Sequence, residues 1–468
     1  MFELRLLETE TATKFNQQLP VFNWHYPFDA DEGEVNDLLI PFTSQNTNKI
    51  KRRAAYIHIP FCETICNFCP FVKEKYSRES QIDEYINALA AEFELKRSVI
   101  GVFAPETIAV GGGTPSLLNE RQIEALGSLI EKNFDTRKLK EFTFELEVKS
   151  VTPEKLYAMR NIGVNRISLG AQTFSEIYRK LFSLDATKKQ ILSSAALANS
   201  IFKYTNVDLL YGLAGQTVAQ LYDDARLILD LQTTTVDVYP INNLTARRSM
   251  HRAVSKNGLS YLPATTRTMF RVHLDRFFRD HGYRAISGYG YAKALTADVV
   301  IQHAPKFIYH DLVYGYHDDQ IVGYGLSAIS QMQNYNLYNS PHISSYVQAL
   351  LVDGTLPHKT VRAMASPERG IVLFPYRGKL DKRKVPWELI PDETWVALHE
   401  LEVAGLVVNE PEEYVLSKLG WLFYVNLMYY LMPNAAKRKM SNIIASHYNG
   451  RKCGDTTLGG ELEELIDL

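Results

Sequence analysis

Hydrophobic and polar positions follow two alternating patterns over residues 54–244. Short apolar, β-rich runs alternate with longer stretches in which apolar residues recur every three or four positions. Strands that are apolar throughout and alternate with helices are typical of a parallel sheet covered by helices. We therefore predict an α/β fold with a partial (β/α)6 barrel, and a doubly wound open sheet is the alternative. The predicted strands are residues 54–61, 106–112, 141–148, 166–173, 204–212 and 235–244, and the clearest helices are 81–99 and 119–134.

The rest of the chain follows less regular patterns. Residues 390–425 show a helix, a strand pair and a second helix, which is typical of a small winged-helix-like domain. The predicted regions are an N-terminal arm (1–53), the barrel (54–244), an extension that lines the substrate pocket (245–345), the winged-helix-like domain (346–450) and a flexible tail (451–468).

Composition excludes several classes of protein. The net charge of −2 gives no basic excess for nucleic acid, so we expect no nucleic-acid partner. The most apolar run, residues 420–433, is too short to cross a bilayer, and the N-terminus lacks the apolar core of a signal peptide. Four cysteines in 468 residues do not make a disulfide framework, and Cys453 is expected to be an unpaired thiol in the tail. We expect a cytoplasmic protein without a membrane partner.

The other three cysteines lie together in YIHIPFCETICNFCPF, residues 56–71, directly after the first predicted strand. The carboxyl ends of barrel strands are where chemistry collects. Cys62, Cys66 and Cys69 would supply soft thiolate ligands, which favour iron–sulfur clusters or zinc. Zinc would need a fourth ligand such as His58, but His58 lies only four residues before Cys62 on an extended segment. On a four-iron cluster, three cysteines leave one iron open to a chelating molecule.

This segment resembles the signature of the radical S-adenosylmethionine superfamily, in particular the branch that contains oxygen-independent coproporphyrinogen III oxidase. The resemblance extends over residues 20–435. It implies a [4Fe–4S] cluster on Cys62, Cys66 and Cys69, with S-adenosylmethionine on the open iron. In such enzymes the reduced cluster cleaves the cofactor to a 5′-deoxyadenosyl radical, which abstracts hydrogen from an unactivated carbon. A flavodoxin or ferredoxin is the implied electron donor.

Further positions match the cofactor site of this family. Residues 109–116, AVGGGTPS, resemble the family's glycine loop, whose backbone approaches the methionine part of the cofactor. Glu145 lies in an apolar strand, where an unpartnered carboxylate is costly. The resemblance implies that Glu145 acts with the three cysteines in catalysis. The implied cofactor-binding residues are Tyr56, Phe68, Gly112, Gly113, Thr114, Glu145, Gln172, Asp208, Asn242 and Ile329.

Two positions depart from the coproporphyrinogen oxidases. Those enzymes have a fourth cysteine where this chain has Phe71, and an arginine for the carboxylate of a second S-adenosylmethionine where it has Leu184. Arg179, Lys180 or Lys188 are the nearby cations that could substitute for that arginine.

Three functions are consistent with the resemblance. The first is class C-type methyl or methylene transfer to an sp2 carbon of a small molecule, which would use a second S-adenosylmethionine near Gln172, Asp208 and Asn242. The second is oxidative decarboxylation of a porphyrinogen propionate. The third is a haem chaperone without catalysis. The aromatic-rich residues 305–330 are expected to line the substrate pocket, and the histidines to be weighed as haem ligands or substrate contacts are His303, His310 and His317.

Overall fold

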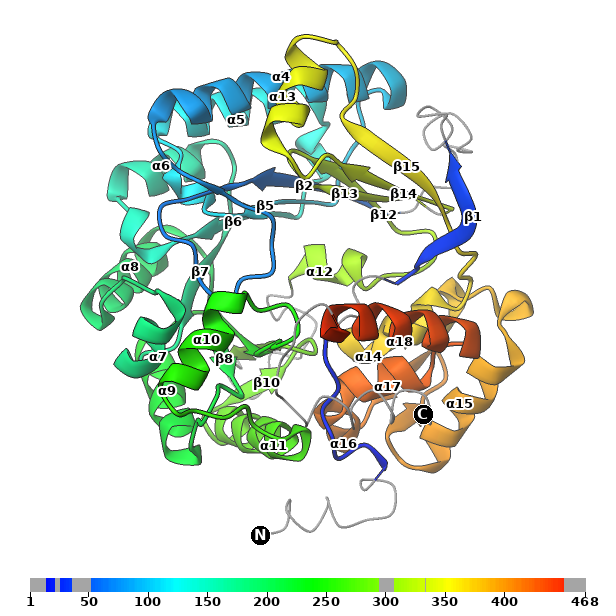
Figure 1. Cartoon of the computed structure of the whole chain (residues 1–468). Helices are drawn as coiled ribbons and strands as arrows, with labels where there is room; N and C mark the ends of the chain where they lie inside the picture. Colours follow the sequence, from blue (N-terminus) through cyan, green and yellow to red (C-terminus); the bar gives the residue numbers. More distant parts are fainter. Residues whose placement is uncertain (1–13, 22–25, 36–51, 294–306, 333, 450–468) are drawn as a thin grey trace.

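Six parallel strands form the centre of the molecule and pair with one another in chain order. The computed structural model describes residues 14–21, 26–35, 52–293, 307–332 and 334–449 (Figure 1). Strand order without a reversal is that of a barrel wall, whereas a doubly wound sheet reverses its order at a switch point. The α/β barrel prediction is therefore confirmed. The strands are β2 (Arg53–Ile59), β5 (Thr107–Gly112), β6 (Glu141–Leu146), β7 (Arg166–Gln172), β8 (Tyr204–Tyr211) and β9 (Thr235–Pro240).

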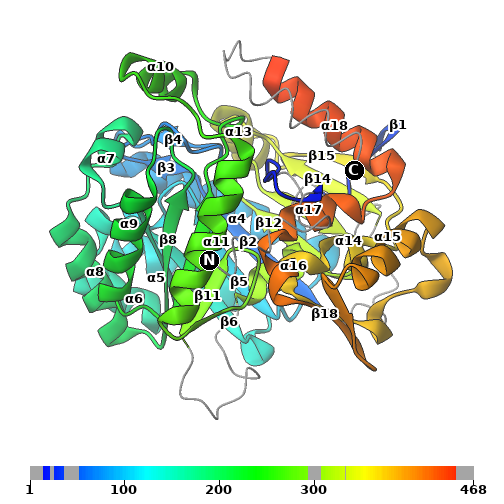
Figure 2. The same cartoon turned by 90° about the horizontal axis from the view of Figure 1, so that it is seen from below.

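Helices between these strands cover the outer face of the sheet (Figures 1 and 2). Several begin where the sequence supplies a cap: Asn119, Thr187 and Thr217 each form a capping box with a glutamine three residues later. The helices are α4 (Glu79–Ile100), α5 (Glu120–Asn133), α6 (Pro153–Asn161), α7 (Glu176–Phe182), α8 (Lys188–Ile201), α9 (Val218–Asp230) and α11 (Ala264–Asp280).

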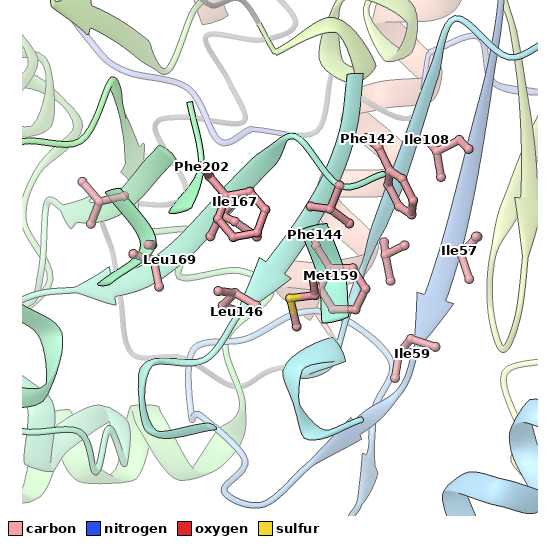
Figure 3. Packing of buried hydrophobic residues seen from close by; sticks show 14 of the residues in the cluster. Ile57, Ile59, Ile108, Phe142, Phe144, Leu146, Met159, Ile167, Leu169 and Phe202 are labelled. Carbon is pink, nitrogen blue, oxygen red and sulfur yellow. The ribbon is translucent and has the colours of Figure 1, made fainter. Parts of the chain in front are cut away.

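Alternation along each strand separates the core from the barrel interior. Phe142, Phe144 and Leu146 of β6 point outward into the main hydrophobic cluster, as Figure 3 shows. Residues between them, such as Thr143 and Glu145, therefore face inward. The outward positions bury apolar surface under the helices, so the inward positions are left for function.

The sheet continues beyond the six central strands at both edges. Beside β2 it adds β12 (Gln320–Tyr324), parallel to β2, and then the antiparallel β13 (Ile329–Met332), β14 (Tyr335–Asn339), β15 (His358–Ala363) and β1 (Asp29–Val35). Beside β9 it adds β11 (Gly290–Lys293) and β10 (Tyr283–Ala285). The residues expected as a separate arm and extension thus supply strands to the main sheet. The chain segments that connect these strands contain α10 (Arg248–Lys256), α12 (Ile308–Val313) and α13 (Ile343–Leu351).

A second cluster of buried residues lies around a three-stranded sheet in the C-terminal part. The predicted helix, strand pair and helix of residues 390–425 appear as α15, β17–β18 and α16–α17. Part of the range predicted for this domain, β15, belongs to the main sheet instead. The elements of this second unit are α14 (Arg369–Arg377), β16 (Lys379–Asp381), α15 (Asp392–Val403), β17 (Val407–Asn409), β18 (Glu413–Leu416), α16 (Lys418–Leu422), α17 (Tyr424–Tyr430) and α18 (Asn434–Asn449).

In the described part of the chain, no helix combines the length and the apolar character needed to cross a membrane.

A buried ion pair joins α4 to the strands beside β2. Glu92 and Lys96 are fully buried, with 2.6 Å between their charged atoms. The Glu92 carboxylate accepts hydrogen bonds from the Gly325 backbone (2.7 Å), the Tyr346 hydroxyl (2.6 Å) and the Asn339 amide (2.7 Å). Lys96 donates to the Gly323 carbonyl. This network therefore fixes the turn that leads from β12 into β13.

Loss of one partner of this pair should destabilise the fold. Lys96→Met leaves a buried carboxylate without its cation, so we expect the free energy of unfolding to fall by ~3–5 kcal/mol. Denaturant unfolding followed by circular dichroism measures it. The control is Lys132→Met, which removes the exposed partner of Glu94 and should change stability far less. Equal effects of the two substitutions would contradict the role of the pair.

Candidate active site

The cysteine loop leaves the carboxyl end of β2 and returns along a short parallel pair, β3 (Phe61–Cys62) with β4 (Glu74–Lys75). Cys62 is buried, and Cys66 and Cys69 are half-buried. All three are free thiols, and the backbone of Cys69 donates a hydrogen bond to the Cys66 carbonyl (3.4 Å). Cys453 lies outside the described residues. The loop thus presents three thiols at the carboxyl edge of the sheet, as the sequence predicted.

Asn67 holds this loop in place. Its side-chain amide donates to the Leu181 carbonyl (3.0 Å) and the Ser183 hydroxyl (3.2 Å) at the end of α7. Its side-chain oxygen accepts from the Ser249 hydroxyl (2.7 Å), and its carbonyl accepts from the Arg247 backbone (2.9 Å) at the start of α10. The segment between Cys66 and Cys69 is therefore tied to two helices that follow later strands.

The environment of the thiols suits a cationic ligand. Burial, together with the charges of Cys69 and Cys62, raises the pKa of Cys66 to about 12. A thiol of this kind becomes a thiolate only beside strong positive charge, which coordinated iron supplies. In the described residues, no three cysteine, histidine or acidic side chains are grouped closely enough for a single metal ion. A four-iron cluster binds each thiolate through a different iron, so it needs a wider spacing.

His58, the alternative zinc ligand, is occupied. Its Nε2 donates to the Val72 carbonyl (3.1 Å), which leaves Nδ1 to accept from the Tyr56 hydroxyl (3.0 Å). Burial lowers the pKa of His58 to about 4, so the ring is neutral. His58 therefore links β2 to the cysteine loop and does not complete a zinc site.

The glycine loop is packed against the protein itself. A Cβ on Gly111 would lie 2.7 Å from the Glu145 carboxylate, one on Gly112 would lie 2.5 Å from the His58 ring, and one on Gly113 would lie 2.6 Å from the Pro60 backbone. The Thr114 backbone donates to the Phe61 carbonyl (2.7 Å). These glycines therefore allow the loop after β5 to lie directly beside the cysteine loop, a reason that the sequence alone did not give.

Glu145 faces the barrel interior from β6. The Glu145 side chain is exposed to the barrel interior, and this interior is itself enclosed by protein. Burial therefore raises the pKa of Glu145 to about 7. Among the described residues, its side chain accepts one hydrogen bond, from the Gly112 backbone (3.3 Å). A carboxylate in this position has unused acceptor capacity, so it can bind an amine or a hydroxyl of a ligand.

A second acidic group lies across the interior on β8 and β9. Asp208 and Asp237 are paired in register, and the Asn206 amide donates to both carboxylates, at 2.8 and 3.2 Å. Burial and the charge of Asp237 raise the pKa of Asp208, while burial raises the pKa of Asp237 to about 6. The charge of Arg166, at the base of the interior, lowers the pKa of both carboxyl groups and so partly offsets the rise. The sequence analysis missed Asp237, although its inward position follows from strand alternation.

Aromatic side chains complete the interior. Tyr56 stacks on Tyr309 of α12, with ring centroids 5.7 Å apart. His310 of α12 forms a hydrogen bond through Nδ1 with the Tyr376 hydroxyl (2.7 Å), and burial lowers its pKa to about 3. Tyr239 of β9 faces the same space. The aromatic-rich segment thus contributes rings to the interior, and its role in lining a substrate pocket stays a prediction; Tyr309 had not been singled out.

The remaining predicted residues lie around this centre. Gln172 ends β7 in the left-handed region (φ 68°), at a bulge. Phe68 packs edge-on against Phe182, with ring centroids 5.2 Å apart. Ile329 begins β13, two strands from β2. Asn242, after β9, donates to the Val21 carbonyl (3.3 Å) and so contacts the N-terminal arm. His317 lines a separate cavity with Arg369, and His303 lies outside the described residues.

The departures from the oxidase pattern have clear surroundings. Leu184 packs in an apolar cluster with Tyr178 and Phe182. Arg179 is buried, and its guanidinium donates to the carbonyls of Ala171 (3.0 Å) and Thr173 (2.8 Å). The Lys180 and Lys188 side chains are exposed. Phe71 is 58% exposed beside the cysteine loop.

Comparison with known proteins gives a consistent picture. The sequence model described as Radical SAM superfamily matches residues 56–228. The chain is 28% identical over 322 residues to the heme chaperone HemW of Bacillus subtilis, covering 68% of this chain and 80% of that protein. It is 27% identical over 298 residues to the oxygen-independent coproporphyrinogen III oxidase of Escherichia coli, covering 63% of this chain and 64% of that enzyme. Over 242 residues it is 31% identical to anaerobilin synthase of Escherichia coli, covering 51% and 54%.

Among solved structures, coproporphyrinogen III oxidase (HemN) from Escherichia coli has a TM-score of 0.72 at 22% identity, covering 92% of this chain and 98% of that one. This likeness confirms the fold. The chain spans less than two thirds of the oxidase and anaerobilin synthase sequences it matches. These three relatives are named for heme, coproporphyrinogen or anaerobilin, and none of the three is named for methyl transfer.

Glu145→Gln should stabilise the protein without cofactor. Between the ordinary glutamate pKa of ~4.3 and about 7, folded Glu145 keeps a proton that the unfolded chain has lost. Ionisation of Glu145 therefore lowers the free energy of unfolding as the pH rises from the ordinary glutamate pKa to about 7, and the full loss is present above pH 7. We expect the variant to melt at a higher temperature than the wild type at pH 8, with the difference shrinking towards pH 5.

Differential scanning calorimetry at several pH values measures this effect. Glu176→Gln, a change on the exposed face of α7, is the matched control and should give no such pH-dependent gain. A Glu145→Gln protein that is less stable at pH 8 would show that the carboxylate has a stabilising partner in the fold.

Proposed function

We propose that this chain, which belongs to the HemN-like branch of the radical SAM superfamily, is an enzyme that abstracts hydrogen from a tetrapyrrole substrate. One observation carries the proposal. Tyr56, Glu145 and Asp208, from three different strands, face one half-open space beside the cysteine loop. Burial is the main cause that raises the pKa of both Tyr56 and Asp208, and the nearby Glu145 carboxylate raises both further.

The residues present fit the cofactors of the superfamily, a [4Fe–4S] cluster and S-adenosylmethionine. Cys62, Cys66 and Cys69 would hold the cluster, and all three are free thiols. Burial raises the pKa of Cys66, so its thiolate form would need the positive charge that coordinated iron supplies. Glu145 would accept a hydrogen bond from the amino group of S-adenosylmethionine. When bound, the reduced cluster supplies the electron that cleaves S-adenosylmethionine to a 5′-deoxyadenosyl radical.

The protein's own part is to bind, orient and exclude water. The Tyr56–Tyr309 stack closes the interior beside β2, and the Asp208–Asp237 pair supplies hydrogen-bonding capacity on the opposite strands. The interior carries more acidic groups than cations, and Arg166 is the buried cation that offsets the Asp208–Asp237 pair. A sulfonium cofactor would lower the electrostatic cost of these carboxylates, so the site favours a cationic ligand.

A tetrapyrrole is the substrate class that the observations favour. Relatives of this chain are named for heme and for coproporphyrinogen, which are both tetrapyrroles. Tyr239, Tyr309 and His310 provide partly exposed rings along the interior against which such a substrate would pack. These points support tetrapyrrole chemistry over the methyl transfer first expected from the sequence.

The surroundings of Leu184 support hydrogen abstraction from the substrate itself. Methyl transfer of the class C type would need a second S-adenosylmethionine, and the coproporphyrinogen oxidases hold the carboxylate of such a second molecule with an arginine where this chain has Leu184. Leu184 lies in an apolar cluster, and Arg179 already serves two backbone carbonyls. We therefore propose that one S-adenosylmethionine per turnover is enough.

The cluster ligands can be tested by iron analysis. Anaerobically reconstituted protein should bind roughly four irons and four sulfides, the content of one cubane cluster. Each of Cys62→Ala, Cys66→Ala and Cys69→Ala should abolish the brown chromophore and the cleavage of S-adenosylmethionine. Cys453→Ala is the matched control and should retain both. Loss of the cluster in that control would overturn the ligand assignment.

Labelled cofactor tests the source of the hydrogen. With S-adenosylmethionine that carries a CD3 group, 5′-deoxyadenosine should remain unlabelled, and methionine should be the sulfur product. The formation of 5′-deoxyadenosine should rise when coproporphyrinogen III or heme is added. It should not rise with a non-tetrapyrrole aromatic such as tryptophan. Deuterium in 5′-deoxyadenosine with S-adenosylhomocysteine would instead establish methyl transfer. Tight heme binding without any turnover would favour the chaperone function.

A further inference from the structure

The cysteine loop lies beside a cationic helix that the proposed chemistry does not use. Figure 2 shows α10 projecting from the molecule on the side of β3 and β4. The contact is direct, because the backbone of Arg247 and the hydroxyl of Ser249 both bond to Asn67, between Cys66 and Cys69.

The helix has two distinct faces. Met250 and Val254 are buried in the apolar cluster against which Phe68 of the cysteine loop also packs. The Arg252 and Lys256 side chains, one helical turn apart, are exposed, as is Arg247 at the cap. The helix is therefore anchored by one face and presents positive charge on the other.

No acidic residue offsets this charge locally in the sequence. Residues 238–274 contain no aspartate or glutamate, although the whole chain has slightly more acidic than basic residues. Two exposed acids at the cysteine loop, Glu63 and Asp185, have their carboxylates 3.9 and 3.3 Å from the Lys149 ammonium, which offsets their charge. A cationic surface on a protein of net charge −2 is a local feature and favours an acidic partner.

The cysteine loop adds an apolar contact point. Phe71, two residues after Cys69, is 58% exposed. Exposed aromatic and arginine side chains are enriched in protein–protein interfaces. Electron transfer to a cluster on this loop requires a donor to approach it closely, and α10 adjoins the loop through the bonds from Arg247 and Ser249 to Asn67.

We propose that the cationic face of α10, with the exposed part of the cysteine loop, docks an acidic protein that carries a one-electron flavin centre. This inference rests on the proposed function. Each encounter passes one electron from the reduced donor to the cluster; the donor leaves oxidised by one electron, and no atom or proton is exchanged.

Charge reversal on α10 tests the surface. The variant is Arg252→Glu/Lys256→Glu, and the probe is reduced flavodoxin in the presence of S-adenosylmethionine, with 5′-deoxyadenosine as the product measured. We expect the flavodoxin-driven rate at low salt to fall roughly tenfold or more, because opposite charges accelerate association by that order. The rate with dithionite should be unchanged. Added salt should slow the wild type and leave the variant nearly unaffected.

Two further variants keep the result interpretable. Arg252→Gln/Lys256→Gln removes charge without adding acid to the helix and should give a smaller loss. Lys138→Glu/Lys203→Glu changes charge equally at the opposite, amino-terminal edge of β6 and β8 and should leave the flavodoxin-driven rate unchanged. An equal loss in this control would overturn the proposal.

The other outcomes are also distinct. A normal flavodoxin-driven rate in the α10 variants would exclude this surface. A higher KM for the substrate with dithionite as reductant would assign α10 to binding of an anionic substrate and overturn the docking proposal. Absence of any 5′-deoxyadenosine in the wild type with dithionite would refute the proposed function itself.

Discussion

The cost of burying carboxyl groups inside the sheet is the constraint on which this structure depends. Glu145, Asp208 and Asp237 all face the interior, and burial raises the pKa of each. Folding alone gives no reason for such groups, because a protonated or apolar residue would cost less there. The outward positions of the same strands carry the stability, through a continuous apolar cluster under the helices. The barrel can therefore hold an interior that suits a cationic ligand better than it suits an empty site.

The second requirement is that a loop bearing three thiols be fixed relative to that interior. Each anchor comes from a different part of the chain: His58 from β2, Asn67 through α7 and α10, and the glycine loop after β5. Glycine is needed at Gly112 because a Cβ would meet the His58 ring at 2.5 Å. Close packing of the two loops thus places the thiols near Glu145. The same anchoring joins α10 to the loop and connects the outer surface to the buried chemistry.

The position of Leu184 separates this chain from the oxidases that it resembles. An arginine there would be buried among Tyr178, Phe182 and other apolar residues, and only a bound anion would offset its charge. A leucine in this place removes the need for such an anion. The fold is shared with HemN, but fold alone does not fix the reaction. The combination of a complete cysteine motif, acidic interior and apolar Leu184 favours a radical reaction with a single bound cofactor.

The sequence by itself determined the elements and the chemistry. The alternation of apolar strands and amphipathic helices predicted the barrel. The spacing of Cys62, Cys66 and Cys69 predicted thiolate ligands for iron–sulfur or zinc, and the resemblance of the motif implied a [4Fe–4S] cluster. Both are local patterns: periodicity reflects which face of one element is buried, and a short loop can bring its own ligands together. Glu145 was also recognisable, because an acid in an apolar strand needs a reason.

Only the tertiary structure decided which distant residues share a space. Asp237 faces Asp208 because β8 and β9 pair in one particular register, and Tyr309 reaches Tyr56 because α12 returns to β2 from some 250 positions later in the chain (positions 56 and 309). Sequence patterns could not give these contacts, nor the position of α10 beside the cysteine loop. Strand alternation states that a side chain faces inward, but what it meets there depends on every other strand and helix that encloses the same interior.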